Sequence, residues 1–107
     1  MRTIPQPGEV WFIDLGLVGK PRYALVLAAQ TDARLALASV VLITKQFEDT
    51  PYEVTLPRVP WLREQSYINA QSIQPVKFTE FIRKAPGKFD ARVLGEVETA
   101  LKGWLKL

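Results

Sequence analysis

Two apolar segments, Arg22-Tyr-Ala-Leu-Val-Leu-Ala28 and Leu35-Ala-Leu-Ala-Ser-Val-Val-Leu-Ile-Thr44, decide the fold of this chain. The first segment is short and apolar throughout, which predicts a buried strand. The first half of the second segment also suits a helix, but the β-branched run from Val40 to Ile43 favours a strand. A polar turn from Gln30 to Arg34 separates the two segments.

Outward from this pair, shorter segments rich in β-branched and aromatic residues predict three further strands. They are Glu9–Leu15, Tyr52–Leu56 and Ser66–Gln74, the last of which we expect to end at Pro75. Pro57–Gln65 contains two prolines and is predicted to be a loop. After Asp90, a good N-cap residue, apolar residues from Val93 to Leu105 recur at helical spacing.

This pattern predicts a mainly β fold with a C-terminal α-helix, in which a small twisted barrel or half-barrel carries the helix packed on it. A length of 107 residues suits a single domain over residues 1–107. Trp11 and Trp104 are expected in the core.

The composition excludes several kinds of chemistry. The chain has no cysteine and no histidine, so zinc, haem and iron–sulfur sites are not expected, nor are Ser-His or Cys-His nucleophile pairs. We therefore expect no cofactor and no metal. The net charge of +3 is compatible with RNA or with an acidic protein partner. The first eight residues are polar and proline-rich, and no apolar run is long enough to span a bilayer, so we expect a cytoplasmic protein without a membrane segment.

Candidate site residues lie where the two central strands end. Arg22 opens one predicted strand and Thr44 closes the other. If the two strands are adjacent and antiparallel, these residues share one edge of the sheet.

The order of these segments resembles a known family. Gly8-Glu-Val-Trp-Phe-Ile-Asp14, followed by Arg22 ahead of Ala24-Leu-Val-Leu27, is similar to the opening strands of the MazF/PemK toxins. Val40–Thr44, Tyr52–Leu56, Asn69-Ala-Gln71 and the terminal helix resemble the later elements of that family. The resemblance extends from about Pro7 to the C-terminus.

The resemblance implies an SH3-like small β-barrel of about five to seven antiparallel strands and a homodimer. It also implies a metal-independent endoribonuclease, an mRNA interferase that cleaves single-stranded RNA by transesterification. The expected partner is a cognate acidic antitoxin whose flexible tail occupies the RNA groove. Carried over by position, the catalytic residues are Arg22 and Thr44, and the substrate-binding residues are Lys20, Tyr23, Lys45, Gln46 and Gln71.

The sequence departs from the family pattern at two places. Tyr23 stands where the family usually has proline, which adds a ring that stacks on bases if it is exposed. The connection from Gly16 to Pro21 is short and holds no carboxylate, so the general base is not identified. The nearest carboxylates by sequence are Asp14, Glu48 and Glu53.

Other interpretations stay open at this stage. A strand-end arginine is by default a surface residue, Gln71 is equally well an exposed strand residue, and Trp61 and Tyr67 suit a core lid or a dimer contact. Two other functional classes also remain: a non-catalytic SH3-like module that binds RNA or protein, and a toxin of similar fold that poisons DNA gyrase.

Overall fold

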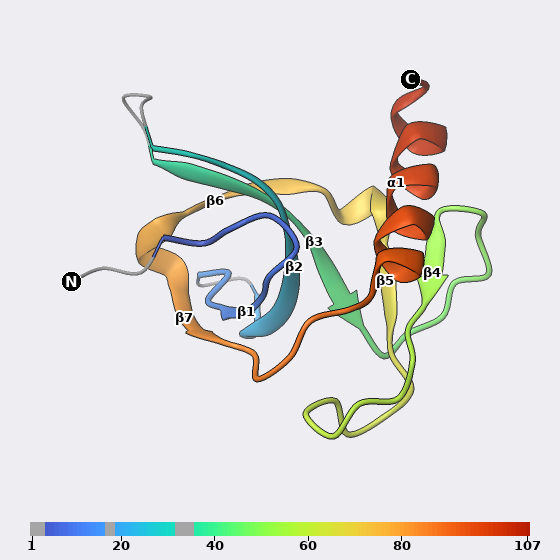
Figure 1. Ribbon diagram of the computed structural model, residues 1–107, viewed down its shortest axis with the longest axis horizontal. Helices are drawn as coiled ribbons and strands as arrows, with labels where there is room; N and C mark the ends of the chain where they lie inside the picture. The colour runs from blue at the N-terminus through green and yellow to red at the C-terminus, as the bar shows by residue number, and fades with distance from the viewer. Residues whose placement is uncertain (1–3, 17–18, 32–35) are drawn as a thin grey trace.

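The computed structural model describes residues 4–16, 19–31 and 36–107, and its strands form one antiparallel sheet with a helix at one end (Figure 1). In chain order the elements are β1 (Val10–Ile13), β2 (Arg22–Gln30), β3 (Leu37–Thr44), β4 (Glu53–Thr55), β5 (Tyr67–Asn69), the 3-10 turn η1 (Ala70–Ser72), β6 (Gln74–Lys77), the 3-10 turn η2 (Phe78–Glu80), β7 (Phe81–Lys84) and α1 (Ala91–Leu105).

The sheet has seven strands in the order β4-β5-β3-β2-β1-β7, and β6 also pairs with β3. All of the pairings are antiparallel. The predicted mainly β fold with a C-terminal helix is confirmed. Within the part of the chain that the structure describes, no pairing joins the edge strands β4 and β7, so the sheet is strongly curved but not closed.

Three predicted segments touch residues outside the described ranges. They are the turn over Gln30–Arg34, the first residue of the strand predicted at Leu35 and the middle of the connection from Gly16 to Pro21.

The segment from Ser66 to Gln74 is predicted to be one strand, but in the structure a 3-10 turn divides it. Only Tyr67–Asn69 forms β5, because the Asn69 side chain accepts a hydrogen bond from the Gln71 N–H and starts the 3-10 turn η1. The chain then resumes as β6, and Pro75 lies inside this strand rather than ending it. Pro75 lies opposite Ser39 where β6 pairs with β3, and its missing N–H removes at most one hydrogen bond from this pairing.

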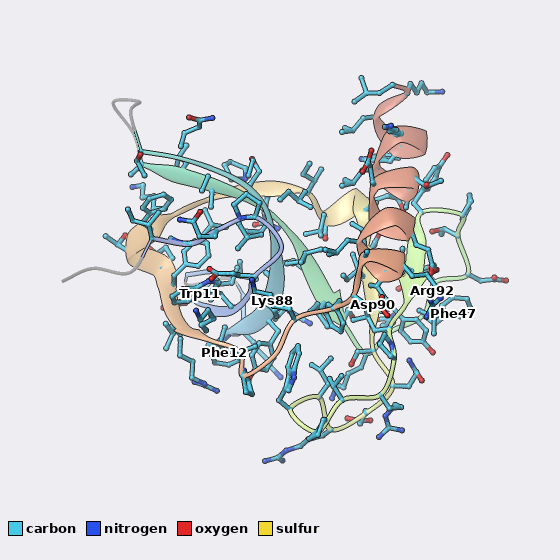
Figure 2. The ribbon with its side chains drawn as sticks, viewed as in Figure 1. Trp11, Phe12, Phe47, Lys88, Asp90 and Arg92 are labelled. Atoms are coloured by element: carbon cyan, nitrogen blue, oxygen red, sulfur yellow. The ribbon has the colours of Figure 1, made fainter. Side chains whose placement is uncertain are left out.

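The helix α1 begins as predicted. The Asp90 carboxylate accepts a hydrogen bond from the Val93 N–H at 3.0 Å, and Figure 2 shows Asp90 where the chain enters the helix. Val93 and Val97 are buried against the sheet. The prediction of a buried Trp104 is wrong: its side chain is 40% exposed. The last turn of α1 extends past β4 (Figure 1), and there the Trp104 ring packs against the ring of Tyr52. Trp11 is buried as predicted.

A buried carboxylate ties the N-terminal turn to the sheet. Glu9 is 7% exposed and accepts hydrogen bonds from the Gln6 N–H, the Trp11 indole N–H and the Lys84 ammonium. Burial opposes ionisation, but these three donors together hold the pKa of Glu9 below its usual range. The network joins β1 to β7, the strand that follows η2 and that the sequence analysis did not predict.

Among the described residues, no helix is both long enough and apolar enough to cross a lipid bilayer.

Candidate functional site

Arg22 and Thr44 lie at the same end of the β2–β3 pair. The strands are adjacent and antiparallel, and the last position of their pairing at this end joins Ala24 with Leu42. Arg22 and Thr44 lie two residues beyond it, Arg22 opposite Ile13 of β1 and Thr44 opposite Tyr67 of β5. Residues two apart in a strand project from the same face, so both side chains share the face of Leu42. Both also line the same two hollows of the surface.

The polar groups of the two side chains are available to a ligand. The Thr44 Oγ1 atom accepts a hydrogen bond from the Gln46 N–H at 3.1 Å, which fixes the oxygen and leaves its own proton free to donate. Arg22 is exposed, and in the described parts of the chain its guanidinium makes no ion pair. The pair therefore offers a fixed positive charge and a hydroxyl donor side by side.

The larger hollow, here called the aromatic groove, has a volume of about 600 Å³. Its floor is one row of side chains across the sheet: Arg83 of β7 pairs with Phe12 of β1, which pairs with Tyr23 of β2. The rings of Phe12 and Tyr23 are 5.1 Å apart, and the Arg83 guanidinium lies 4.3 Å from the Phe12 ring centroid. Trp61, from the loop between β4 and β5, adds its ring 5.2 Å from that of Tyr23.

The rim of the aromatic groove is positively charged. Arg22, Arg63 and Arg83 line it together with Lys45, and Glu64 is the one carboxylate among the described lining residues. Lys45 and Glu64 form an ion pair at 3.1 Å, but both side chains are largely exposed, so water and salt weaken this pair. Such a groove attracts phosphate groups and gives bases aromatic faces to stack on.

The smaller hollow, here called the polar pocket, has a volume of about 220 Å³. It is lined by Arg22, Leu42, Thr44, Gln46, Glu48, Asn69 and Ser72. The Ser72 hydroxyl is already engaged, because it accepts from the Leu42 N–H and donates to the Asn69 carbonyl. Arg22 and Thr44 thus stand where the aromatic groove and the polar pocket meet.

The predicted binding residues divide between these hollows. Tyr23 and Lys45 line the aromatic groove, and Gln46 lines the polar pocket. Lys20 and Gln71 line neither hollow. Asn69, the N-cap of the η1 turn, and Ser72, its last residue, line the polar pocket in place of Gln71, which is exposed.

The candidate carboxylates are also separated by the structure. Asp14 accepts a hydrogen bond from the Gly16 N–H and lines a different hollow, beside Glu80. Both oxygens of Glu53 accept backbone N–H groups. Glu48 lines the polar pocket together with Arg22 and Thr44.

Sequence reasoning did not single out Phe12 as a site residue. The alternation of side chains in the first strand indicates which face Phe12 shares with its neighbours. The register of β1 and β2 is also needed, because it is what sets Phe12 opposite Tyr23. Within the described residues, no cluster of three or more acidic side chains suited to a metal ion is found.

A family model of the PemK-like, MazF-like toxins of type II toxin–antitoxin systems matches residues 6–105. A comparison with curated protein sequences finds no match.

Solved structures share the fold. An endoribonuclease in complex with its cognate antitoxin, from a mycobacterial species, is 24% identical with a TM-score of 0.78, covering 96% of each chain. The toxin MazF-mt6 of Mycobacterium tuberculosis is 20% identical with a TM-score of 0.78, covering 92% of this chain and 97% of its own. MazF from Deinococcus radiodurans is 24% identical with a TM-score of 0.67, covering 98% of this chain and 99% of its own. At these identities the similarity establishes the fold.

Proposed function

The chain belongs to the PemK-like, MazF-like toxin family of type II toxin–antitoxin systems, and on this premise we propose that it is an endoribonuclease toxin that cleaves single-stranded RNA. One observation carries the proposal. The guanidinium of Arg22 and the hydroxyl proton of Thr44, both without a partner among the described residues, lie at the junction of a cationic aromatic groove and a polar pocket.

The proposed reaction is transesterification without a metal ion. The ribose 2′-oxygen attacks the adjacent phosphorus, negative charge builds on the phosphorane oxygens, and the 5′-oxygen leaves. Arg22 stabilises that charge with two parallel N–H donors, since a guanidinium stays charged at working pH and matches the phosphate geometry. The Thr44 hydroxyl donates to a phosphate oxygen from a position fixed by the Gln46 N–H.

The aromatic groove suits the RNA strand on one side of the cleaved bond. Its cations neutralise phosphates, and the rings of Tyr23 and Trp61 offer faces for unpaired bases. A duplex does not present its bases in this way, so the groove favours single-stranded RNA. Tyr23, Lys45 and Gln46 are the proposed substrate-binding residues, and Lys20 and Gln71, which lie outside both hollows, are proposed to contact RNA only beyond the cleaved bond.

Two protein partners complete the proposal. Membership of a toxin–antitoxin family and the cationic rim support an acidic antitoxin whose tail competes with RNA, in the cytoplasm. An apolar hollow of about 290 Å³ between β2 and α1, lined mostly by leucine and valine, supports a homodimer.

The test is direct. Purified protein is incubated with a long single-stranded RNA in the presence of EDTA, and the products are mapped. Defined fragments ending in a 2′,3′-cyclic phosphate, with a 5′-hydroxyl on the other side, are the expected result. Binding of the RNA without cleavage would contradict the enzymatic function and favour a binding module.

A further inference from the structure

The proposed reaction needs a group that removes the proton of the 2′-hydroxyl, and the polar pocket contains one. Glu48 is the only carboxylate among the described residues that line this pocket, where it accompanies Arg22 and Thr44. Building on the endoribonuclease function proposed above, we propose that Glu48 is the general base of RNA cleavage.

The face of the sheet supports this assignment. Arg22 and Thr44 project from the same face as Leu42, which also lines the polar pocket, whereas Tyr23 and Ile43 project toward the aromatic groove. The attacking and leaving oxygens lie on opposite sides of the phosphorus during in-line displacement. A phosphate held between Arg22 and Thr44 with its reaction axis running from one hollow to the other has one reacting oxygen on the polar-pocket side, which Glu48 lines.

The other nearby carboxylates have different surroundings. Glu64 borders the aromatic groove and pairs with Lys45, and Asp14 lines a separate hollow. Both oxygens of Glu53 are occupied by backbone N–H groups at 2.7 Å. In the described portion of the chain, the Glu48 carboxylate has neither a hydrogen-bond donor nor an ion-pair partner, so it is available to accept a proton.

The loop that carries Glu48 is held in place. The Glu53 carboxylate accepts the N–H of Glu48 with one oxygen and the N–H of Thr50 with the other. Between them, Asp49 adopts the left-handed conformation with φ of 58°, which a residue other than glycine adopts at some cost. Glu53 itself lies opposite Asn69 of β5, another residue of the polar pocket. Glu53 is thus a positioning residue that fixes the backbone of Glu48 relative to the pocket.

The proton balance of the step closes with solvent water alone. Glu48 takes the 2′-hydroxyl proton as the bond from the 2′-oxygen to phosphorus forms. The bond from phosphorus to the 5′-oxygen breaks with its electron pair on that oxygen, which takes a proton from water. The hydroxide left behind accepts the proton from Glu48 and restores the carboxylate. The products are a 2′,3′-cyclic phosphate and a 5′-hydroxyl.

The charged groups around Glu48 shape how cleavage depends on pH. Arg22 of β2 lines the same pocket, Glu53 of β4 accepts the backbone N–H of Glu48, and Asp49 follows Glu48 in the chain. A general base acts as its anion, so the proposed role of Glu48 predicts that activity is lost on the acidic side of the profile.

The experiment measures kcat/KM for RNA cleavage in EDTA between pH 5 and 9 for wild type, Glu48→Gln, Glu48→Ala and Glu96→Gln. Glu48→Gln is expected to cleave about 100- to 10,000-fold more slowly and to lose the acidic limb of the profile. Its RNA affinity stays at the wild-type level or rises. Added formate partly restores Glu48→Ala. Glu96, an exposed glutamate of α1 paired with Arg92, is the matched control and is expected to leave cleavage unchanged.

The outcomes separate the two proposals. Wild-type rates and an unchanged acidic limb in Glu48→Gln, with cleavage still abolished by Arg22→Ala, would overturn the assignment of the base and leave the endoribonuclease function standing. Wild-type protein that cleaves no RNA would overturn both.

Discussion

Arg22 and Thr44 line the same two hollows at one end of β2 and β3, each two residues beyond the last paired position of these strands, Ala24 with Leu42. Neither residue needs a loop to bring it there. A paired strand end holds a side chain more rigidly than a loop does, which suits a reaction that depends on positioning a phosphate.

The hydroxyl of Thr44 is expected to contribute more to the rate of RNA cleavage than the packing of its β-branched side chain. Thr44→Val removes the donor but keeps the β-branched packing, and loss of one hydrogen bond to a charged group predicts cleavage about 10- to 100-fold slower. Thr44→Ser keeps the hydroxyl and is expected to retain most activity. Thr99→Val, in α1, removes a hydroxyl that donates only to the Gly95 carbonyl and serves as the control. Equal rates for Thr44→Val and wild type would exclude a role for the hydroxyl.

Trp61 is expected to contribute to RNA binding through stacking. Trp61→Ala predicts RNA affinity lower by about 5- to 100-fold, since one base stacked on an aromatic ring contributes about 1–3 kcal/mol. Fluorescence anisotropy with a labelled single-stranded RNA measures this. Trp104→Ala removes a tryptophan that packs on Tyr52 at the end of α1 and should leave affinity unchanged. Circular dichroism melting confirms that both variants fold, and similar affinity losses in both would argue against the stacking role.

Acid is expected to destabilise the fold through Glu9. Because hydrogen bonds hold the folded-state pKa of Glu9 below its ordinary value of 4.5, the stabilisation is complete above that value and is lost as the pH falls through the folded pKa. Glu9→Gln should lower the free energy of unfolding at pH 7 by about 1–3 kcal/mol, because it leaves the Lys84 contact without a charge partner.

Urea unfolding of wild type and Glu9→Gln between pH 3 and 7 measures the effect. The two curves are expected to converge as the pH falls. Burial raises the pKa of Glu53, but hydrogen bonds from the N–H groups of Glu48 and Thr50 lower it further, so the net pKa is also below its ordinary value. Glu53 therefore adds to the acid sensitivity of both proteins alike. Curves that stay parallel throughout would show that Glu9 is not the source.

Loosening the Glu53 loop is expected to slow cleavage without affecting RNA binding. Glu53→Ala frees the N–H groups of Glu48 and Thr50, so the backbone that carries Glu48 into the polar pocket is no longer fixed. We predict a kcat about 10-fold lower or more, with KM little changed, because misplacing a catalytic group by an ångström is costly. The acidic limb of the pH profile should remain, since Glu48 is still present. A change in KM alone would place Glu53 in RNA binding instead.

Much of the fold follows from local sequence signals. The Asp90 cap with its apolar spacing predicts α1, and the β-branched runs predict β2 and β3. β7 was missed because Phe81–Lys84 is four residues long and has one apolar face at most, so only its pairing with β1 makes it a strand. Trp104 was misplaced because helical spacing gives the face of a residue but not where the sheet beneath it ends.

The strand-end positions of the candidate residues were predictable, whereas contacts that depend on strand pairing were not. Arg22 and Thr44 each adjoin an apolar run, and the resemblance to the toxin family is what selects them as catalytic candidates. The row from Arg83 through Phe12 to Tyr23 joins three strands that are distant in sequence, and its members are adjacent only through the sheet order. Asn69 and Ser72 were passed over in favour of Gln71 because the η1 turn that exposes Gln71 has no strong sequence signal.

Arg22 is proposed to stabilise the phosphate during cleavage, and a comparison of variants at this position tests that role. Rates of cleavage of the same single-stranded RNA in EDTA are measured for wild type, Arg22→Ala, Arg22→Lys and Arg92→Ala, the last a surface arginine of α1 paired with Glu96. The account predicts wild-type activity for Arg92→Ala, a loss of about 100-fold or more for Arg22→Ala, and only partial activity for Arg22→Lys, which keeps the charge but not the bidentate geometry. Cleavage by Arg22→Ala at the wild-type rate would contradict it.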